Sequence, residues 1–382
     1  MPPTIPASTI GAPSFDPSTL LDPSNPLLPT ALSHLQPPHN DLRLALLTLF
    51  SLPASAGDTY TYHATASVTL PQVQSAVAAG PAHGLLDWYV DASGHARGQH
   101  PPPADVAAYV GLFDATKAPA AALKGFAANA KRGSLREGVA KWLTTRRFVA
   151  VGVPAVAKLK ADGNGKWYVN PYAEFLAWAC GALQWCGPDA NAGLVRVSHH
   201  VLPLFMHHFG CVCPNWEALS LIAWFARPGA KGRPKKRVLD VGSGNGYWTA
   251  MLRMEPWGLD VTPVDNMQSR WRTVWVGDTL VVDAVKWLQK REVALQREEV
   301  LLLVYPVTQG GFTEGVIDAF KGDVVVVAGT QNGSGYTGFQ GECVDTWFKK
   351  RGGWDLCVRV PLMSFPGKDD ALFIFRRKDA AA

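Results

Sequence analysis

Charge and cysteine are both scarce in this chain of 382 residues. Charged residues make up 18% of the sequence and the net charge is only +5, so a protein dedicated to nucleic-acid binding is disfavoured, although an anionic partner stays open. Six cysteines are too sparse for a disulfide scaffold in a chain of this length. The composition therefore favours a reducing, intracellular setting, in the cytoplasm or the nucleus.

Long apolar runs are also missing. The longest one, residues 175–187, spans about 13 residues and contains Gln184, whereas a membrane-spanning helix needs about 20. The first 30 residues hold eight prolines, two aspartates and no Lys or Arg, which fits neither a secretory leader nor a mitochondrial presequence. We therefore expect a soluble protein that has no membrane partner.

Apolar residues as a whole are plentiful, at 47%, so most of the chain can build a core. Residues 1–40 are rich in Pro, Ser and Thr and predict a flexible tail. Residues 41–195 predict a mainly helical region, in which Ser134 followed by Glu137 marks the start of one helix.

The sequence pattern changes after residue 231. Apolar runs such as "RVLDV", "DVTPV", "VLLLVY" and "DVVVVAG" alternate there with helical segments. Buried parallel strands have this continuous apolar character, and strands that alternate with helices predict a doubly wound α/β sheet. The last two runs, "LCVRVPL" and "ALFIFRR", are joined by only eight residues, too few for a crossover helix, so they should form an antiparallel hairpin.

A glycine-rich turn joins the first of these strands to a helix. In "VLDVGSGNGYW", Asp240 is followed by Gly242, Gly244 and Gly246. Glycine permits positive φ angles and close approach of a ligand, and the helix beyond offers unpaired N–H groups. A dinucleotide-binding turn would need glycine where Tyr247 stands, and the Gly-Lys-Ser/Thr of a P-loop is absent.

A second acidic residue lies at the end of the next strand. Asp265 closes "LDVTPVD", 19 residues after Gly246. A carboxylate at the end of this strand can accept hydrogen bonds from both ribose hydroxyls of a nucleotide. The turn and this acid together predict a nucleotide-containing ligand.

The glycine turn, Asp265, the fourth strand and the terminal hairpin together resemble class I S-adenosylmethionine (SAM)-dependent methyltransferases, over about residues 205–377. The resemblance implies a Rossmann-like, mostly parallel, seven-stranded sheet that ends in an antiparallel hairpin. It implies a SAM-binding domain over residues 196–382, with SAM as the cofactor. The turn residues implied to hold the cofactor are Asp240, Gly242, Ser243, Gly244, Asn245 and Gly246.

The same resemblance implies an Asp or Asn after the third strand as the adenine contact. Two residues qualify, Asp278 in "WVGDT" and Asp283 in "VVDAVKWL". Asp283 fits the strand-to-helix turn better because an amphipathic helix follows it. Either residue can equally be an ordinary helix cap.

Four residues are candidates for the catalytic centre. Tyr305 ends the fourth strand, at the carboxyl edge where ligands of open α/β sheets bind, and is also a candidate cofactor contact. Methyltransferases that act on amides or base amines have Asp/Asn-Pro-Pro-Tyr/Phe there, so the departure disfavours those acceptors. Gln331 and Asn332 follow the fifth strand. His208 belongs to a cluster of histidines and cysteines that matches no usual zinc spacing, so we expect no metal and a base from a nearby helix.

The sequence thus predicts a SAM-dependent methyltransferase that transfers the methyl group to a small molecule or a protein in preference to nucleic acid. One alternative is a methyltransferase fold that serves as a scaffold or subunit without catalysis. A second is a nicotinamide-dependent oxidoreductase, which Tyr247 and the terminal hairpin disfavour.

Overall fold

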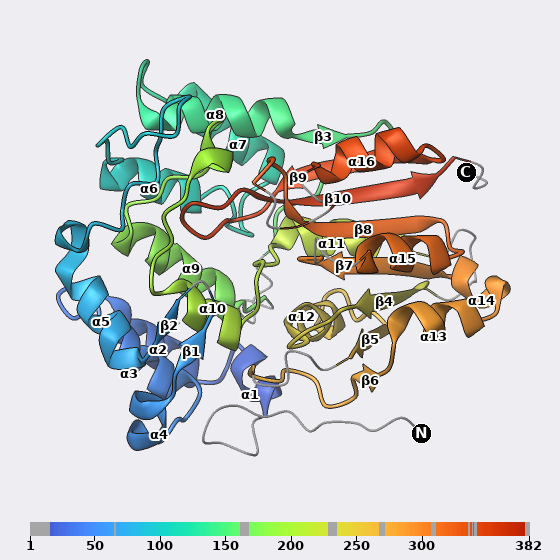
Figure 1. Ribbon diagram of the computed structural model, residues 1–382, viewed down its shortest axis with the longest axis horizontal. Helices are drawn as coiled ribbons and strands as arrows, with labels where there is room; N and C mark the ends of the chain where they lie inside the picture. The colour runs from blue at the N-terminus through green and yellow to red at the C-terminus, as the bar shows by residue number, and fades with distance from the viewer. Residues whose placement is uncertain are drawn as a thin grey trace.

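The computed structural model describes residues 16–64, 66–160, 168–227, 235–266, 272–306, 311–334, 337, 339 and 342–378. Figure 1 shows a twisted β-sheet on one side of the molecule and a helical region on the other. Within the described residues, no helix is both long and apolar enough to cross a membrane.

The large sheet has eight strands in the order β3-β9-β10-β8-β7-β4-β5-β6. Strands β4 to β8 are parallel to one another, whereas β10 pairs antiparallel with both β8 and β9. The strands are β3 (Phe148–Val149), β4 (Arg237–Val241), β5 (Val261–Asp265), β6 (Leu280–Val281), β7 (Glu299–Val304), β8 (Val324–Thr330), β9 (Trp354–Pro361) and β10 (Asp370–Arg377).

The expectation of seven strands was one too few. The extra strand, β3, comes from the helical region and pairs antiparallel with β9, Phe148 opposite Arg359 and Val149 opposite Val358. This segment is a strand because it pairs with the open edge of β9. The sequence could not predict it, since two residues are too few to show the alternation of a strand.

Helices cover both faces of the sheet, and alternate strand residues point to opposite faces. On one face Leu301 and Leu303 pack with α13, α15 and α16. On the other, Val300 and Leu302 join a core that extends through α11 and α12 into the helical region. The helices are α11 (Trp216–Phe225), α12 (Tyr247–Arg253), α13 (Ala284–Lys290), α14 (Val293–Arg297), α15 (Phe312–Ala319) and α16 (Val344–Arg351).

The helical region of the structure extends beyond the predicted residues 41–195 and, over residues 16–208, contains ten α-helices within the described residues and a small antiparallel pair, β1 (Tyr62–His63) and β2 (Ser67–Val68). Two 3-10 helices lie at Gly80–His83 and Ala192–Leu194. The α-helices are α1 (Pro17–Leu21), α2 (Leu27–Leu35), α3 (Leu42–Leu49), α4 (Ala54–Thr59), α5 (Leu70–Ala79), α6 (Pro103–Val110), α7 (Pro119–Ala128), α8 (Leu135–Arg146), α9 (Pro171–Ala182) and α10 (Leu202–His208).

The prediction of a flexible tail over residues 1–40 was wrong for its second half. Residues 27–35 form α2, which packs against α3 and α9 and buries Ala31 and Leu35. Pro17 begins α1, and Pro26 and Pro29 lie at the N-cap and in the first turn of α2, where proline is tolerated. Residues 1–15 lie outside the described part of the chain.

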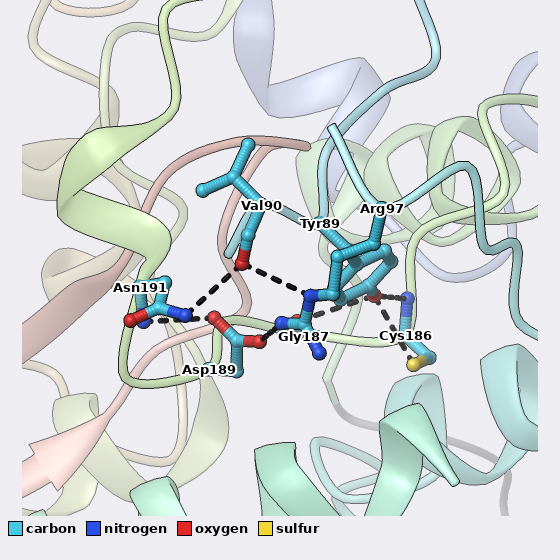
Figure 2. Close-up of polar contacts among 7 residues, drawn as sticks. All are labelled: Tyr89, Val90, Arg97, Cys186, Gly187, Asp189 and Asn191. Atoms are coloured by element: carbon cyan, nitrogen blue, oxygen red, sulfur yellow. Dashed lines mark hydrogen bonds and ion pairs between the residues drawn. The ribbon is translucent and has the colours of Figure 1, made fainter. Parts of the chain in front are cut away.

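Two loops of the helical region are tied together around Val90. Figure 2 shows the Val90 carbonyl accepting hydrogen bonds from Arg97 Nε at 2.9 Å and Asn191 Nδ2 at 3.0 Å. Arg97 also forms an ion pair with Asp189, and the Tyr89 hydroxyl accepts from the Cys186 amide at 2.9 Å. Segments about 90 residues apart are thereby fixed to one another.

The β9–β10 connection, residues 362–369, is clamped by the helical region. The Ser364 amide donates to the Tyr109 hydroxyl at 3.1 Å. Gly367 has φ +80°, and a Cβ added there would lie 3.1 Å from the Trp88 ring, so only glycine fits without displacement. The helical region thus positions a loop of the sheet as well as covering its face.

Candidate functional site

A cavity of about 1030 Å³ opens at the carboxyl ends of β4, β5 and β7. Open α/β sheets bind ligands at this edge. The lining residues from the sheet and its turns include Gly242, Ser243, Gly244, Asn245, Asp265, Asn266, Arg272, Asp283, Lys286, Tyr305 and Phe312, and α10 and the loop after it add Met206, Phe209, Gly210 and Cys211.

The glycine turn forms one side of the cavity. Gly242, Gly244 and Gly246 have φ angles of +72°, +57° and +78°, a region that side chains with a Cβ rarely adopt. Gly246 is also restricted by space, since a Cβ there would lie 2.4 Å from Val276 Cγ2. Cβ atoms added at Gly242 and Gly244 would meet neighbours only at 3.8 and 3.7 Å, which leaves those backbones open to a ligand.

Asp265 lies directly beside this turn. Its Oδ2 accepts a hydrogen bond from the Gly244 amide at 2.9 Å, and the residue is only 9% exposed. This bond orients the carboxylate toward the cavity that both residues line. We call the glycine turn, Asp265 and Asp283 the turn wall.

The two candidates for the adenine contact are placed differently. Asp283 lines the cavity and also caps α13, accepting from the Lys286 amide at 3.0 Å. Asp278 lies outside the lining and pairs with Arg253 through two hydrogen bonds of 2.9 and 2.7 Å. Hydrogen bonds from that guanidinium lower the pKa of Asp278. Only Asp283 is therefore available to a ligand in the cavity.

Asp240, the acid of the motif, does not line the cavity. It is fully buried and accepts from the Thr249 hydroxyl at 2.6 Å. Within the described residues its other oxygen has no hydrogen-bond partner. Burial without a cation in contact raises the pKa of Asp240 to about 7. The structure therefore gives Asp240 a role in holding α12 to β4.

Ser243 and Asn245 complete the turn and both line the cavity. The Ser243 carbonyl accepts from the Gly246 amide at 2.9 Å, which closes the turn. The Asn245 side chain accepts from the Tyr247 amide at 3.2 Å, and its carbonyl accepts from the Trp275 amide at 2.8 Å. These bonds fix the turn before any ligand arrives.

Tyr305 faces the cavity from the end of β7. Its φ of +50° is unusual for a residue with a side chain, and its amide donates to the Ala328 carbonyl at 2.7 Å. Lys368 Nζ donates to the Tyr305 hydroxyl at 3.3 Å and lies 4.7 Å from the ring centroid. Burial raises the pKa of Tyr305, and the Lys368 charge opposes that rise.

Gln331 and Asn332 were expected at the catalytic centre, but they do not line the cavity. Gln331 is buried, and its side chain donates to Asp369 Oδ1 at 2.7 Å. Asn332 accepts from the Ser334 amide at 3.0 Å and packs against Gly193 of the helical region. Gln331 therefore holds the end of β8 to the β9–β10 connection, and Asn332 holds it to the helical region, which covers that end.

His208 is placed behind the cavity lining. Its ring nitrogens lie 3.0 Å from the Tyr62 hydroxyl and 3.0 Å from the Thr273 hydroxyl, and the ring stacks on Phe50 at 4.3 Å. Burial keeps the pKa of His208 well below its usual value, so the ring is neutral. No group of three or more metal-binding side chains occurs among the described residues, His208 and its neighbours included.

Two cationic residues near the cavity were not predicted. Arg272 lies over the turn, with Nη1 3.7 Å from the position of a Cβ on Gly244 and 3.7 Å from Cys211 Sγ. Lys368 contacts Tyr305 from the β9–β10 connection. Neither belongs to a recognisable motif, although the "GKDD" of residues 367–370 offered a hint as a charged cluster between two apolar strands. We call Tyr305 and residues 368–370 the hairpin wall, of which only Tyr305 lines the cavity.

No family model and no curated protein matches the chain. Among solved structures, MtNAS in complex with MTA and tNA matches with 14% identity and a TM-score of 0.27, over 42% of this chain and 60% of that one. The small RNA methyltransferase HEN1 matches with 14% identity and a TM-score of 0.25, over 44% and 26%. This chain thus spans about three fifths of the first protein and a quarter of the second, and at these scores the likeness carries no functional argument.

Proposed function

We propose that the protein is a SAM-dependent methyltransferase that acts on a small molecule or a protein. The observation that carries the proposal is the turn wall, in which open glycine backbone, the Asp265 carboxylate and the Asp283 carboxylate line one cavity. The terminal antiparallel hairpin supports the same reading. Tyr247 stands where a dinucleotide-binding turn needs its third glycine. Its side chain is buried, and its hydroxyl donates to Asn170 at 2.7 Å, which disfavours the oxidoreductase.

The lining residues fit the chemical groups of SAM. Gly242 and Gly244 leave room for the amino-acid end, and the Arg272 guanidinium beside them suits its carboxylate. Asp265 can accept from the ribose hydroxyls, and Asp283 can accept from the adenine amine. The cavity of about 1030 Å³ exceeds the usual size of a small-ligand pocket, so it has room for an acceptor as well.

SAM would supply an activated methyl group in this site. The protein's part is to align the acceptor and to exclude water, which are the main demands of a direct displacement. Tyr305 is the lining residue best placed to contact the acceptor, since it closes the cavity at the end of β7. Its constrained backbone holds the ring in one position.

Calorimetric titration with SAM and with its demethylated product, S-adenosylhomocysteine (SAH), tests the proposal. Asp265→Ala should weaken SAM binding by about 150-fold, the loss expected for two hydrogen bonds to a charged group at about 1.5 kcal/mol each. Asp260→Ala is the matched control because Asp260 forms an exposed ion pair with Arg237 at the amino ends of β4 and β5, away from the cavity. Absence of binding of both compounds to the wild-type protein would contradict the proposal.

A scaffold without catalysis stays the second candidate, because Gln331, Asn332 and His208 all lie away from the cavity lining. Incubation with methyl-labelled SAM and a fractionated cell extract separates the two candidates. Transfer of label to a small molecule or protein supports the enzyme. Tight SAM binding with no transfer to any fraction supports the scaffold.

A further inference from the structure

The charged residues that line the cavity are confined to one part of it. Among the described residues, the lining carboxylates are Asp265 and Asp283 of the turn wall. The lining cations are Arg272, which lies over the glycine turn, and Lys286, which pairs with Asp283 at 3.8 Å. These four side chains belong to the part of the cavity that suits SAM, so they are not available to an acceptor.

The lining near Tyr305 is apolar or weakly polar. Burial raises the pKa of Tyr305, and Cys211 is close enough to add to that rise. Cys211 Sγ also lies 3.7 Å from Arg272 Nη1, so it stands between the phenol and the glycine turn. Aromatic rings, a thioether and a thiol suit a polarisable, weakly hydrated group. We call Met206, Phe209, Cys211, Val304 and Tyr305 the apolar end of the cavity.

The apolar end offers no general base. His208 lies behind the lining, and both of its ring nitrogens are engaged, by the hydroxyls of Tyr62 and Thr273. The ammonium of Lys368 can only donate, so the Tyr305 oxygen accepts from it at 3.3 Å and keeps its own proton. Tyr305 is therefore a hydrogen-bond donor toward a ligand.

The rest of the cavity supplies no base to the apolar end either. Among the described lining residues, none is His or Glu. Residues 267–271 and 307–310, which are next to lining residues in the chain and lie outside its described part, contain no His, Asp or Glu in the sequence. An alcohol or an amide that has to lose a proton during transfer finds no base here. The acceptor must therefore bring a nucleophile that is already free of its proton.

Oxyanions and amines fit the apolar end poorly. Lys368 does not line the cavity, and Tyr305 and Asp370 already stabilise its charge against burial. A carboxylate in this place would lose most of its hydrogen bonds to water. An amine would become a cation on methylation, and no described carboxylate outside the turn wall lines the cavity to stabilise it. A thiolate loses less on leaving water, because its charge is spread over one large, polarisable atom.

We infer that the methyl acceptor is a small apolar thiol, which binds as a thiolate at the apolar end with its sulfur facing the methyl group of SAM. The inference rests on the proposed function. The sulfonium of SAM is the counter-charge that attracts the thiolate, so no ammonium of the protein is needed. The Tyr305 hydroxyl can donate to the sulfur.

The chemistry balances without a base from the protein. A thiol of ordinary pKa, about 8.5, is partly ionised in water near neutral pH, so its proton leaves to solvent before the transfer. A lone pair of the thiolate sulfur forms the bond to the methyl carbon. The carbon–sulfur bond of SAM breaks, and its electron pair stays on the departing sulfur. The thiolate and the sulfonium both become neutral thioethers.

Transfer from methyl-labelled SAM to thiophenol tests the inference, with phenol and aniline as controls of the same shape. After subtraction of the reaction without protein, thiophenol should be methylated more than about tenfold faster than either control. A smaller preference overturns the inference. Absence of transfer to thiophenol by a protein that binds SAM also overturns it and leaves the proposed function intact. A protein that binds neither SAM nor SAH overturns both.

The pH dependence of the transfer tests whether the protein supplies a base. Phenylmethanethiol is a weaker acid than thiophenol, because its sulfur is not conjugated with the ring. Without a protein base, the midpoint of the pH profile of kcat/KM should follow the acidity of each thiol and lie higher for phenylmethanethiol. A midpoint shared by both thiols would assign the deprotonation to a protein group and overturn the inference.

A pair of variants at Met206 tests the charge of the bound sulfur. Met206 lines the cavity and is half-buried, so a polar side chain of similar length can replace it. Met206→Glu should methylate thiophenol more than about tenfold more slowly than Met206→Gln, because the added carboxylate repels a thiolate. Thr144→Glu, on an exposed position of α8, controls for net charge and should behave as wild type. Equal rates for the two Met206 variants, with SAM bound by both in calorimetry, contradict the inference.

Discussion

The turn wall and the hairpin wall meet at one cavity, which the hairpin wall reaches only through Tyr305, and they are built in different ways. The turn wall consists of backbone amides and of Asp265 and Asp283, which come from consecutive strand ends. The hairpin wall depends on side chains, with Tyr305 held by Lys368 and Asp369 held by Trp142 of α8. A cofactor site can thus be local in sequence, while the site beside it requires the whole fold.

Gly246→Ala should break the turn wall most severely. A Cβ there meets Val276 Cγ2 at 2.4 Å in addition to the strain of a positive φ, so we expect a loss of about 3 kcal/mol in the free energy of unfolding and loss of SAM binding. Gly84→Ala is the matched control, because its φ of +72° and ψ of +15° resemble the +78° and +13° of Gly246 and no atom lies within 4 Å. Its cost should be about 1 kcal/mol. Equal costs in urea denaturation would show that packing at Val276 is unimportant.

Asp240→Asn should make the protein more stable above pH 7. The folded-state pKa of about 7 lies above the ordinary value near 3.8, so the folded state holds a proton between these values. The contribution of Asp240 to the free energy of unfolding therefore falls as pH rises from about 4 to about 7. Asparagine can still accept from Thr249 and does not titrate, so the variant should gain about 4 kcal/mol at pH 8 and almost nothing near pH 4.

Denaturation curves at both pH values check this prediction. Asp278→Asn is the control of opposite sign, because Arg253 lowers the pKa of Asp278. Its small contribution to stability is present above the unfolded pKa and is lost as pH falls. A gain for Asp240→Asn that is the same at pH 4 and pH 8 would mean that titration is not its cause.

Asp283→Ala should weaken SAM binding about tenfold, or about 1.4 kcal/mol, whereas Asp278→Ala should change it less than twofold. The difference follows from placement, since only Asp283 lines the cavity. Calorimetry on both variants compares two acids that the sequence alone could not rank with certainty. The reverse order of effects would move the adenine contact to Asp278 and remove Asp283 from the turn wall.

Trp142→Phe should cost about 1 kcal/mol, the typical net value of one buried hydrogen bond. The loss of the indole donor leaves an oxygen of Asp369 without that bond and raises its pKa, which burial already holds at about 7. Trp178→Phe, which loses a more exposed bond to Asn40, should cost less. If both variants unfold at the same urea concentration, the link between α8 and the hairpin wall contributes little to stability.

The contrast between the walls also explains how far the sequence predicted the site. Asp265 was placed beside the glycine turn because both follow adjacent strands, a relation that the strand pattern reveals. Lys368 meets Tyr305 across 63 residues only after the hairpin folds back under the helical region. Gln331 was expected to face a substrate, but its side chain donates a hydrogen bond to Asp369 instead. No local sequence pattern predicts that contact.

The fold shows the same division. The parallel strands followed from continuous apolar runs, while β3 and α2 were missed because partners elsewhere in the chain create them. The sequence suggested His208 as a base beside the cofactor. In the structure the His208 ring is buried in the core, where it contacts the hydroxyl of Tyr62 from the helical region. The errors at β3, Asn332 and His208 lie where the helical region and the sheet domain meet, whereas those at α2 and Asp240 lie inside one part.

The short strand β3 has a consequence for how the molecule loses its structure. Strand β3 pairs with β9 at the edge of the large sheet. A single hydrophobic core includes residues from Leu20 in α1 to Ile374 in β10. Heating should therefore melt the amino-terminal helices and the carboxy-terminal strands in one cooperative step. A single transition in scanning calorimetry would show that the two halves form one thermodynamic unit, in which loosening the helices also opens the pocket.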